Sequence, residues 1–262
     1  MTETAVAQTE RPTGAATLTV VQNDELVPLD RFADWLDGAE VRVVRAFAGE
    51  EVPSVAEAGD GLIVLGGTMS AHDERRFPVL REVKDLLAAA VGAGLPTLGI
   101  CLGHQLLAEA LGGRVEVAPP PGREAGVVPL SWRAAAAGDP VLGELATARA
   151  GAGVRLGGLP DDHGTALVAS MHADAVVELP PRAVWLAHSA MYPFQAMRVG
   201  SALGVQFHPE ASPALLGRWA SARGEDGGAV EAMAVAHDGE VAALGQALAQ
   251  AFVAQVRRHA RV

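Results

Sequence analysis

The sequence of 262 residues contains a single cysteine and relatively few basic side chains. One cysteine cannot form an internal disulfide, so we expect a protein of a reducing compartment, the cytoplasm. Twenty Lys and Arg residues stand against 31 Asp and Glu residues, which gives a net charge of −11. This balance argues against binding to nucleic acid or to an anionic membrane surface.

Long apolar runs and several common functional motifs are absent as well. No apolar run reaches membrane-spanning length without an interrupting Gly, Pro or charged residue. Residues 1–16 lack the basic and apolar regions of a signal peptide, and their polar, aperiodic composition predicts a flexible tail. The chain has no GxxxxGKS or GxxxxGKT loop and no HExxH spacing, so we expect neither an ATP-binding loop nor a metal site, and no cofactor.

The first half of the chain alternates between strand-like and helix-like patterns. The runs at 61–67 and 95–100 are almost wholly apolar, as in strands buried on both faces of a parallel sheet. Strands that alternate with helices predict an α/β fold with a mostly parallel sheet. The expected strands are 16–24, 41–47, 61–67 and 95–100, and the expected helices are 28–40, 77–94 and 103–113.

The second half of the chain has a less regular pattern. Residues 120–180 mix short β runs with Gly, Ala and Pro, and we expect them to form strands and loops over one side of the sheet. A strand-like run at 201–210 follows, and an Ala-rich pattern predicts a long C-terminal helix at about 229–258. We therefore expect one domain over residues 17–262.

The cysteine, Cys101, stands where a buried strand ends and a helix begins, in the stretch "PTLGICLGHQLLAEALGG". Reactive groups in open α/β sheets lie at the carboxyl ends of the strands. The N-terminus of the helix favours a thiolate, the nucleophilic form of cysteine. Gly99 and Gly103 permit a tight strand-to-helix turn, and the N–H of Leu102 would face a developing oxyanion.

A base for this nucleophile is expected in the stretch "GVQFHPEAS". His208 follows an apolar strand, and Glu210, two residues on, can orient the imidazole. Each of the three residues alone has an ordinary structural interpretation: a small buried hydrophobe, a strand-end histidine and a solvated loop charge. Together, Cys101, His208 and Glu210 have the nucleophile, base and orienting group of nucleophilic catalysis.

The stretches "GICLGHQLLAEALGG" and "GVQFHPE" resemble the two signatures of class I (triad) glutamine amidotransferases, which hydrolyse the side-chain amide of glutamine through a thioester. The stretches "GDGLIVLGGTMSAHDERRF", "REAGVVPL" and "MHADAVVELPPRAVWLAHSAMYPFQAMRVG" are similar to the GMP-synthase-like, stand-alone branch of that family. The resemblance covers about residues 17–219. It implies a flavodoxin-like three-layer sandwich with a mostly parallel central sheet.

The resemblance also implies residue roles. Cys101 matches the nucleophile, His208 the base and Glu210 the orienting carboxylate. Gly67 matches the second oxyanion-hole donor beside Leu102. The resemblance further implies that glutamine binds against a group of three residues, Gln105, His172 and Asp174.

The sequence departs from this branch near the expected substrate pocket. Met171 replaces an aromatic residue, Ala173 replaces a glycine, and residues 147–164 resemble an insertion. Three functions stay open at this point. The first is a glutaminase subunit that supplies ammonia to a separate synthetase, the second a free-standing hydrolase of γ-glutamyl amides or peptides, and the third a non-catalytic binding relative, against which the intact triad argues.

Overall fold

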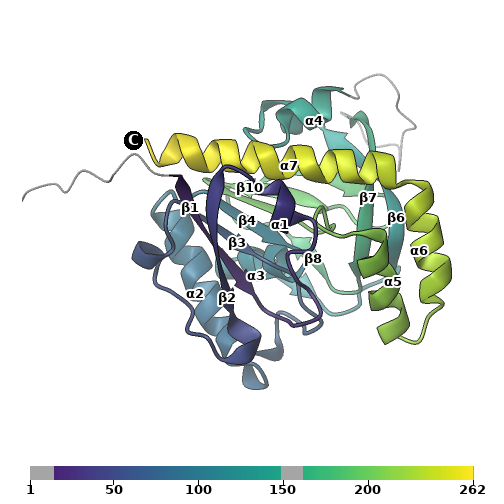
Figure 1. Ribbon diagram of the computed structural model, residues 1–262, viewed down its shortest axis with the longest axis horizontal. Helices are drawn as coiled ribbons and strands as arrows, with labels where there is room; N and C mark the ends of the chain where they lie inside the picture. Colours follow the sequence, from purple (N-terminus) through teal and green to yellow (C-terminus); the bar gives the residue numbers. More distant parts are fainter. Residues whose placement is uncertain (1–14, 149–161, 262) are drawn as a thin grey trace, which may run out of the picture.

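The computed structural model describes residues 15–148 and 162–261, and a large mixed sheet runs through this part of the chain (Figure 1). The strands of this sheet are β1 (Ala16–Gln22), β2 (Ala39–Arg45), β3 (Gly61–Val64), β4 (Thr97–Ile100), β6 (Glu124–Arg133), β7 (Asp162–His172), β9 (Val184–Ser189), β10 (Ala196–Val199) and β11 (Ala202–Val205). A separate antiparallel pair consists of β5 (Arg114–Glu116) and β8 (Ala175–Glu178).

The order of the strands in the large sheet is β2-β1-β3-β4-β11-β10-β9-β6-β7. The first five pair in parallel, and their order is that of a flavodoxin-like sheet. The remaining pairs are antiparallel, so β10 and β6 run against the direction shared by the other strands. The predicted α/β fold with a mostly parallel central sheet is therefore confirmed.

Helices cover both faces of the sheet. They are α1 (Phe32–Trp35), α2 (Val79–Gly92), α3 (Leu102–Ala110), α4 (Gly143–Ala148), α5 (Pro213–Ala222), α6 (Gly227–Ala236) and α7 (Asp238–His259), with short 3₁₀ turns η1 (Ala46–Ala48), η2 (Val55–Glu57), η3 (Asp73–Arg75) and η4 (Ala134–Gly138). Figure 1 shows the long helix α7 crossing one face of the sheet. Helices α2 and α3 pack on the opposite face.

Two buried hydrophobic clusters lie on opposite faces of the sheet, and the side chains of β3 alternate between them. Ile63 points into the cluster that contains Phe252 of α7, whereas Leu62 and Val64 point into the cluster that contains Leu87 of α2. Successive side chains of a strand face opposite sides of a sheet, so an unbroken apolar run is buried on both. This is the physical reason for the apolar run at 61–67.

The helix expected at 28–40 is reduced to the single turn of α1. Asp30 has a left-handed backbone (φ 43°), which a continuous helix does not allow, and its carboxylate accepts a hydrogen bond from the Ser212 amide at 2.6 Å. The apolar residues with helical spacing still lie at the core, with Phe32 and Leu36 buried. The spacing located the buried face correctly but overestimated the length of the helix.

The placement of residues 120–180 over one side of the sheet was also wrong. Strands β6 and β7 pair with each other, and β6 pairs with β9, so this region widens the same sheet at its edge. The helix expected at 229–258 is divided into α6 and α7 by a break at His237 (φ −114°). Residues 1–14 of the expected tail, and residues 149–161 of the expected insertion, lie outside the described residues.

Candidate active site

Cys101 occupies the turn between β4 and α3, at the carboxyl edge of the parallel strands. Its backbone is strained for a non-glycine residue, with φ 50° and ψ −103°. A side chain on Gly103 would place its Cβ 2.1 Å from the Val64 carbonyl oxygen, and one on Gly99 would meet the Gly103 carbonyl oxygen at 2.6 Å. Two glycines are therefore needed for α3 to turn back so closely over the sheet.

His208 lies beside this turn, three residues after the end of β11. Its Nδ1 and the Oε1 of Glu210 are 2.7 Å apart, which leaves the other ring nitrogen for the hydrogen bond with Cys101. All three side chains are buried. The structure thus brings together the three residues that the two motifs singled out, across 107 residues of sequence between Cys101 and His208.

The charge state of His208 follows from its partners. Burial on its own lowers the pKa of this imidazole, but the charges of Glu210 and Cys101 and the hydrogen bonds to both outweigh it and raise the pKa to about 10. The ring of Trp219 packs against the imidazole with centroids 4.6 Å apart.

A glycine pair after β3 forms the opposite wall of the site. The side chain of Asn23 donates to the Leu65 carbonyl at 2.7 Å, and the carboxylate of Asp24 accepts from both the backbone amide and the hydroxyl of Thr68. A Cβ on Gly67 would lie 2.7 Å from Leu102 Cδ2 and 2.5 Å from the sulfur of Met69. The backbone at Gly67 is therefore held close to the first residue of α3.

A cavity of about 250 Å³ opens above Cys101, and we call it the thiol cavity. The substrate-binding candidates Gln105, His172 and Asp174 all line it, as do Met171 and Ala173. The side-chain amide of Gln105 donates to the Asp174 carbonyl at 2.9 Å, so helix α3 is tied directly to the segment after β7. Two of the departures from the branch pattern lie here, Met171 in β7 and Ala173 directly after it.

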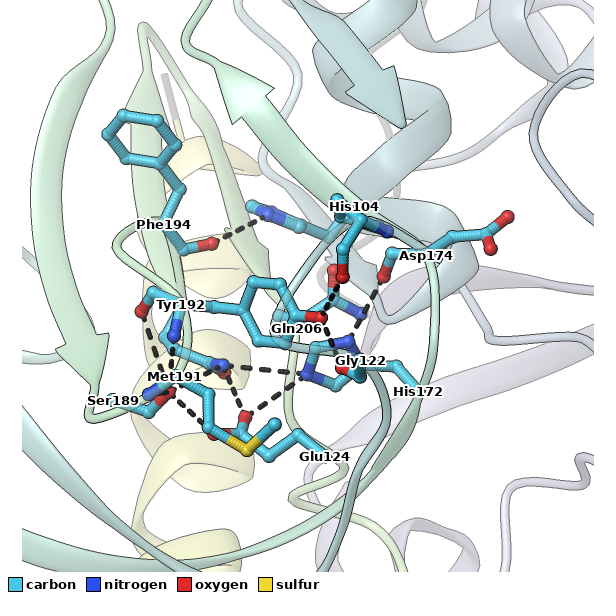
Figure 2. Close-up of polar contacts among 12 residues, drawn as sticks. His104, Gly122, Glu124, His172, Asp174, Ser189, Met191, Tyr192, Phe194 and Gln206 are labelled. Atoms are coloured by element: carbon cyan, nitrogen blue, oxygen red, sulfur yellow. Dashed lines mark hydrogen bonds and ion pairs between the residues drawn. The ribbon is translucent and has the colours of Figure 1, made fainter. Parts of the chain in front are cut away.

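His172 is anchored from below by a buried polar network (Figure 2). Its Nδ1 lies 3.0 Å from the Asp174 carbonyl oxygen, and its Nε2 lies 3.1 Å from the carboxylate of Glu124. The same carboxylate accepts from the Ser189 hydroxyl at 2.6 Å and from the Gln195 amide at 2.6 Å. Both ring nitrogens of His172 are therefore engaged by protein groups, which favours a role in shaping the cavity wall.

His104, three residues after Cys101, is not a second base for the thiol. One ring nitrogen bonds the Phe194 carbonyl at 3.2 Å (Figure 2), and His104 does not line the thiol cavity. Complete burial, with a smaller contribution from the charge of His172, lowers the pKa of His104 to about 3. His104 is thus neutral at physiological pH.

Comparison with known proteins agrees with this geometry. The profile of the family "glutamine amidotransferase class-I" matches residues 36–219. The chain belongs to this family. It is 34% identical over 157 residues to a glutamine-hydrolyzing GMP synthase of Thermomicrobium roseum and 34% identical over 175 residues to one of Aeropyrum pernix.

These matches cover 60% and 65% of this amidotransferase chain but only 24% and 27% of the two GMP synthases. Among solved structures, a glutamine amidotransferase of Thermotoga maritima superposes with a TM-score of 0.72 at 23% identity, covering 92% of this chain and 99% of its own. One from Methylobacillus flagellatus gives 0.72 at 24% identity, covering 94% and 96%. Both likenesses support the fold.

Several residues of this amidotransferase site were missed by the motifs. Asp24, in the loop after β1, accepts hydrogen bonds from Thr68, the residue that follows the glycine pair. Trp219, on α5, packs against His208. Glu124 stands in the stretch "REAGVVPL", whose similarity to the family was a signal that it has a role. In the described part of the chain, no group of three His, Cys, Asp or Glu side chains is suited to hold a metal, and no helix is long and apolar enough to cross a bilayer.

Proposed function

We propose that this amidotransferase hydrolyses the side-chain amide of glutamine through a thioester on Cys101. The thiolate attacks the amide carbon, a C–S bond forms, and the C–N bond breaks as His208 gives its proton to the departing nitrogen. Water then attacks the thioester, His208 takes a proton from it, and glutamate and the thiolate are released. The products are one glutamate and one ammonia for each glutamine and water consumed.

The other residues have supporting roles in this proposal. Glu210 orients the imidazole and balances its positive charge. The backbone amides of Gly67 and Leu102 stabilise the oxyanion that develops on the carbonyl oxygen. Asp174, at the wall of the thiol cavity, has the charge to attract the α-ammonium group of glutamine, and Gln105 lies beside it.

The single observation that best supports this proposal is the hydrogen-bonded series Cys101–His208–Glu210 at a strained strand-to-helix turn. A non-catalytic relative acting only by binding would have no need for that strain or for the charge on His208. We further propose that the ammonia passes to a separate synthetase, because the relatives that the chain matches are glutamine-hydrolyzing GMP synthases.

Replacement of the nucleophile tests the proposal directly. Cys101→Ala is expected to lower glutamine hydrolysis by at least about 10³-fold, and thermal unfolding should show that the variant remains folded. A glutamine-analogue diazo-ketone should label the wild-type protein once, at Cys101. His208→Gln should likewise lose activity, whereas His237→Gln, which changes an exposed histidine at the end of α6, should not. Full activity of Cys101→Ala, or labelling at another residue, would refute the proposal.

A further inference from the structure

Two cavities meet at the Cys101–His208 pair. The thiol cavity contains Cys101 and is the one assigned to the glutamyl part of the substrate. A second cavity of about 330 Å³, which we call the histidine-side cavity, is lined by His208 and does not contain Cys101. Four residues line both cavities, so the two are adjacent, with the pair at their boundary; these residues are Gly67, Thr68, Met171 and Arg223.

The histidine-side cavity has one apolar wall, formed by Leu26, Val27 and Trp219, and a polar part that includes Arg223. The indole of Trp219 is buried, packs on His208 and donates from Nε1 to the Leu26 carbonyl at 2.7 Å, which fixes the segment after β1. Val27 is also buried, whereas the Leu26 side chain is 52% exposed at the rim. Ala222, at the end of α5, and Arg223, the residue after it, also line the cavity, and both are exposed.

The chemistry of thioester formation fixes what points toward this cavity. When the C–N bond breaks, the proton from His208 goes to the leaving nitrogen, so that nitrogen and whatever it bears must lie on the His208 side. Ammonia released from glutamine bears nothing and leaves the space unfilled. A volume of about 330 Å³ is at the lower end of ordinary small-molecule sites, and the wall formed by Leu26, Val27 and Trp219 suits an apolar group.

We propose that the histidine-side cavity is a leaving-group subsite for γ-glutamyl amides whose amine bears an apolar alkyl or aryl substituent. This inference rests on the proposed thioester chemistry at Cys101. The reaction balances as before: a γ-glutamyl amide and water give glutamate and the free amine, with the C–N bond broken and the proton of His208 transferred to the amine. Glutamine is then the smallest substrate of the site, and the substituted amides are the ones that use its full space.

Binding and turnover of two amides test the subsite. The inactive variant Cys101→Ala should bind γ-glutamyl benzylamide at least ten-fold more tightly than γ-glutamyl methylamide by calorimetry. The wild type should hydrolyse the benzylamide with a kcat/KM at least ten-fold above that for the methylamide. Equal binding and equal kcat/KM would overturn the proposal, and that is the result expected if the cavity instead receives part of a synthetase.

A matched pair of variants on α5 locates the effect. Ala222→Phe fills the cavity and should lower the ratio of kcat/KM for benzylamide to that for methylamide by about ten-fold or more. Ala214→Phe, on an exposed position of the same helix, should leave that ratio unchanged. An equal ratio in both variants would overturn the subsite.

Failure of the subsite and failure of the proposed function are distinguishable. If glutamine is hydrolysed and Cys101 is labelled, but the benzylamide has no advantage over the methylamide, only the subsite is wrong. If no γ-glutamyl amide is hydrolysed and the diazo-ketone fails to label Cys101, the thioester chemistry is wrong. Tight binding of the benzylamide to Cys101→Ala tests the subsite without requiring turnover.

Discussion

His208 holds a positive charge beside the Cys101 sulfur over a wide pH range, because its pKa of about 10 lies far above the ordinary value of 6.5. A group with a raised pKa in the folded state binds protons more tightly there than in the unfolded chain. The contact with Glu210 and Cys101 therefore stabilises the fold fully below about pH 6.5. This contribution is lost as the pH rises from 6.5 through 10.

The pH dependence of activity should reveal this charge. In the wild type, we expect kcat/KM for glutamine to fall on the alkaline side near pH 10, where His208 loses the proton that the leaving nitrogen needs. Glu210→Gln keeps the shape of the side chain but removes its charge, so the alkaline limb should move to lower pH and the maximum should fall about 10²-fold or more. A pH–rate profile of both proteins measures this.

An unchanged alkaline limb in Glu210→Gln would contradict the role given to Glu210. Glu51→Gln is a suitable control, because this carboxylate is exposed and lines neither of the two cavities. This control removes one negative charge, as Glu210→Gln does, and should leave the pH–rate profile of the wild type unchanged.

The two motifs could place those residues of the site that lie near Cys101 or His208 in the sequence. Leu102 and Gln105 follow it directly on α3, and Glu210 lies two residues after His208, so strand-end logic was enough to place them. Glu124 could not be found this way. Its partners on β7, β9 and the segment before β10 come together only through the antiparallel half of the sheet, whose position the sequence pattern did not reveal.

At the scale of elements, the loop after β3 is the part of the site with the least regular structure of its own. The residues on either side of its glycine pair, Leu65 and Thr68, are held by hydrogen bonds to Asn23 and Asp24, which follow β1, because β1 and β3 are neighbours in the sheet. Glycine has an unusually wide range of backbone conformations, so a loop with two adjacent glycines depends on such external hydrogen bonds. The proposed oxyanion donor at Gly67 therefore depends on a residue from another strand.

Removal of the Asp24 carboxylate should loosen this donor. Asp24→Ala is expected to lower kcat for glutamine by about ten-fold or more, with a smaller change in KM, since loss of a complete oxyanion donor costs about 10²–10³-fold. Asp24→Asn keeps one acceptor oxygen and should recover part of the activity. Steady-state kinetics of the two variants check this expectation.

Asp34→Ala provides the control, because Asp34 is an exposed acidic residue on the nearby helix α1. If Asp24→Ala and Asp34→Ala have the same kcat, the hydrogen bonds between Asp24 and Thr68 have no part in catalysis. If Asp24→Ala raises KM alone, its role is in binding rather than in stabilising the oxyanion.

Elements were predicted well where local periodicity decided them and poorly where distant contacts did. Helix α2 and strands β3 and β4 are specified by their own apolar patterns. Helix α1 is cut short by Asp30, whose partner Ser212 is 182 residues away in sequence. The start of α7 is fixed in a similar way, because Asp238 pairs at 2.7 and 2.8 Å with Arg31, which is 207 residues away in sequence.

At the scale of the whole molecule, the site lies open at one edge of the sheet, with both cavities reaching the surface beside the segment Thr68–Ser70. The next residues include η3, which presents acidic and basic side chains next to each other. We expect a synthetase to dock on the rim around Cys101, over segment 68–77 and the expected insertion at 147–164; most of the insertion lies outside the described residues. The docking face stays a prediction, with 68–77 as its described part.

At this scale, we expect the rate of glutamine turnover to depend on a partner protein. Two peptide orientations at the Gly66–Gly67 pair would differ little in energy, so the oxyanion donor at Gly67 is expected to be fully in place only when a synthetase packs against segment 68–77. We therefore expect glutamine turnover by the isolated chain to be slow, below about 1 s⁻¹, which is under the ordinary range for an unaided enzyme of about 10 s⁻¹. Glutamate release, measured with and without an ammonia-accepting synthetase and its acceptor substrate, should rise at least ten-fold when they are present. Turnover of glutamine at tens per second by the isolated chain would instead show that the donor is already in place, and that the protein works as a free-standing hydrolase.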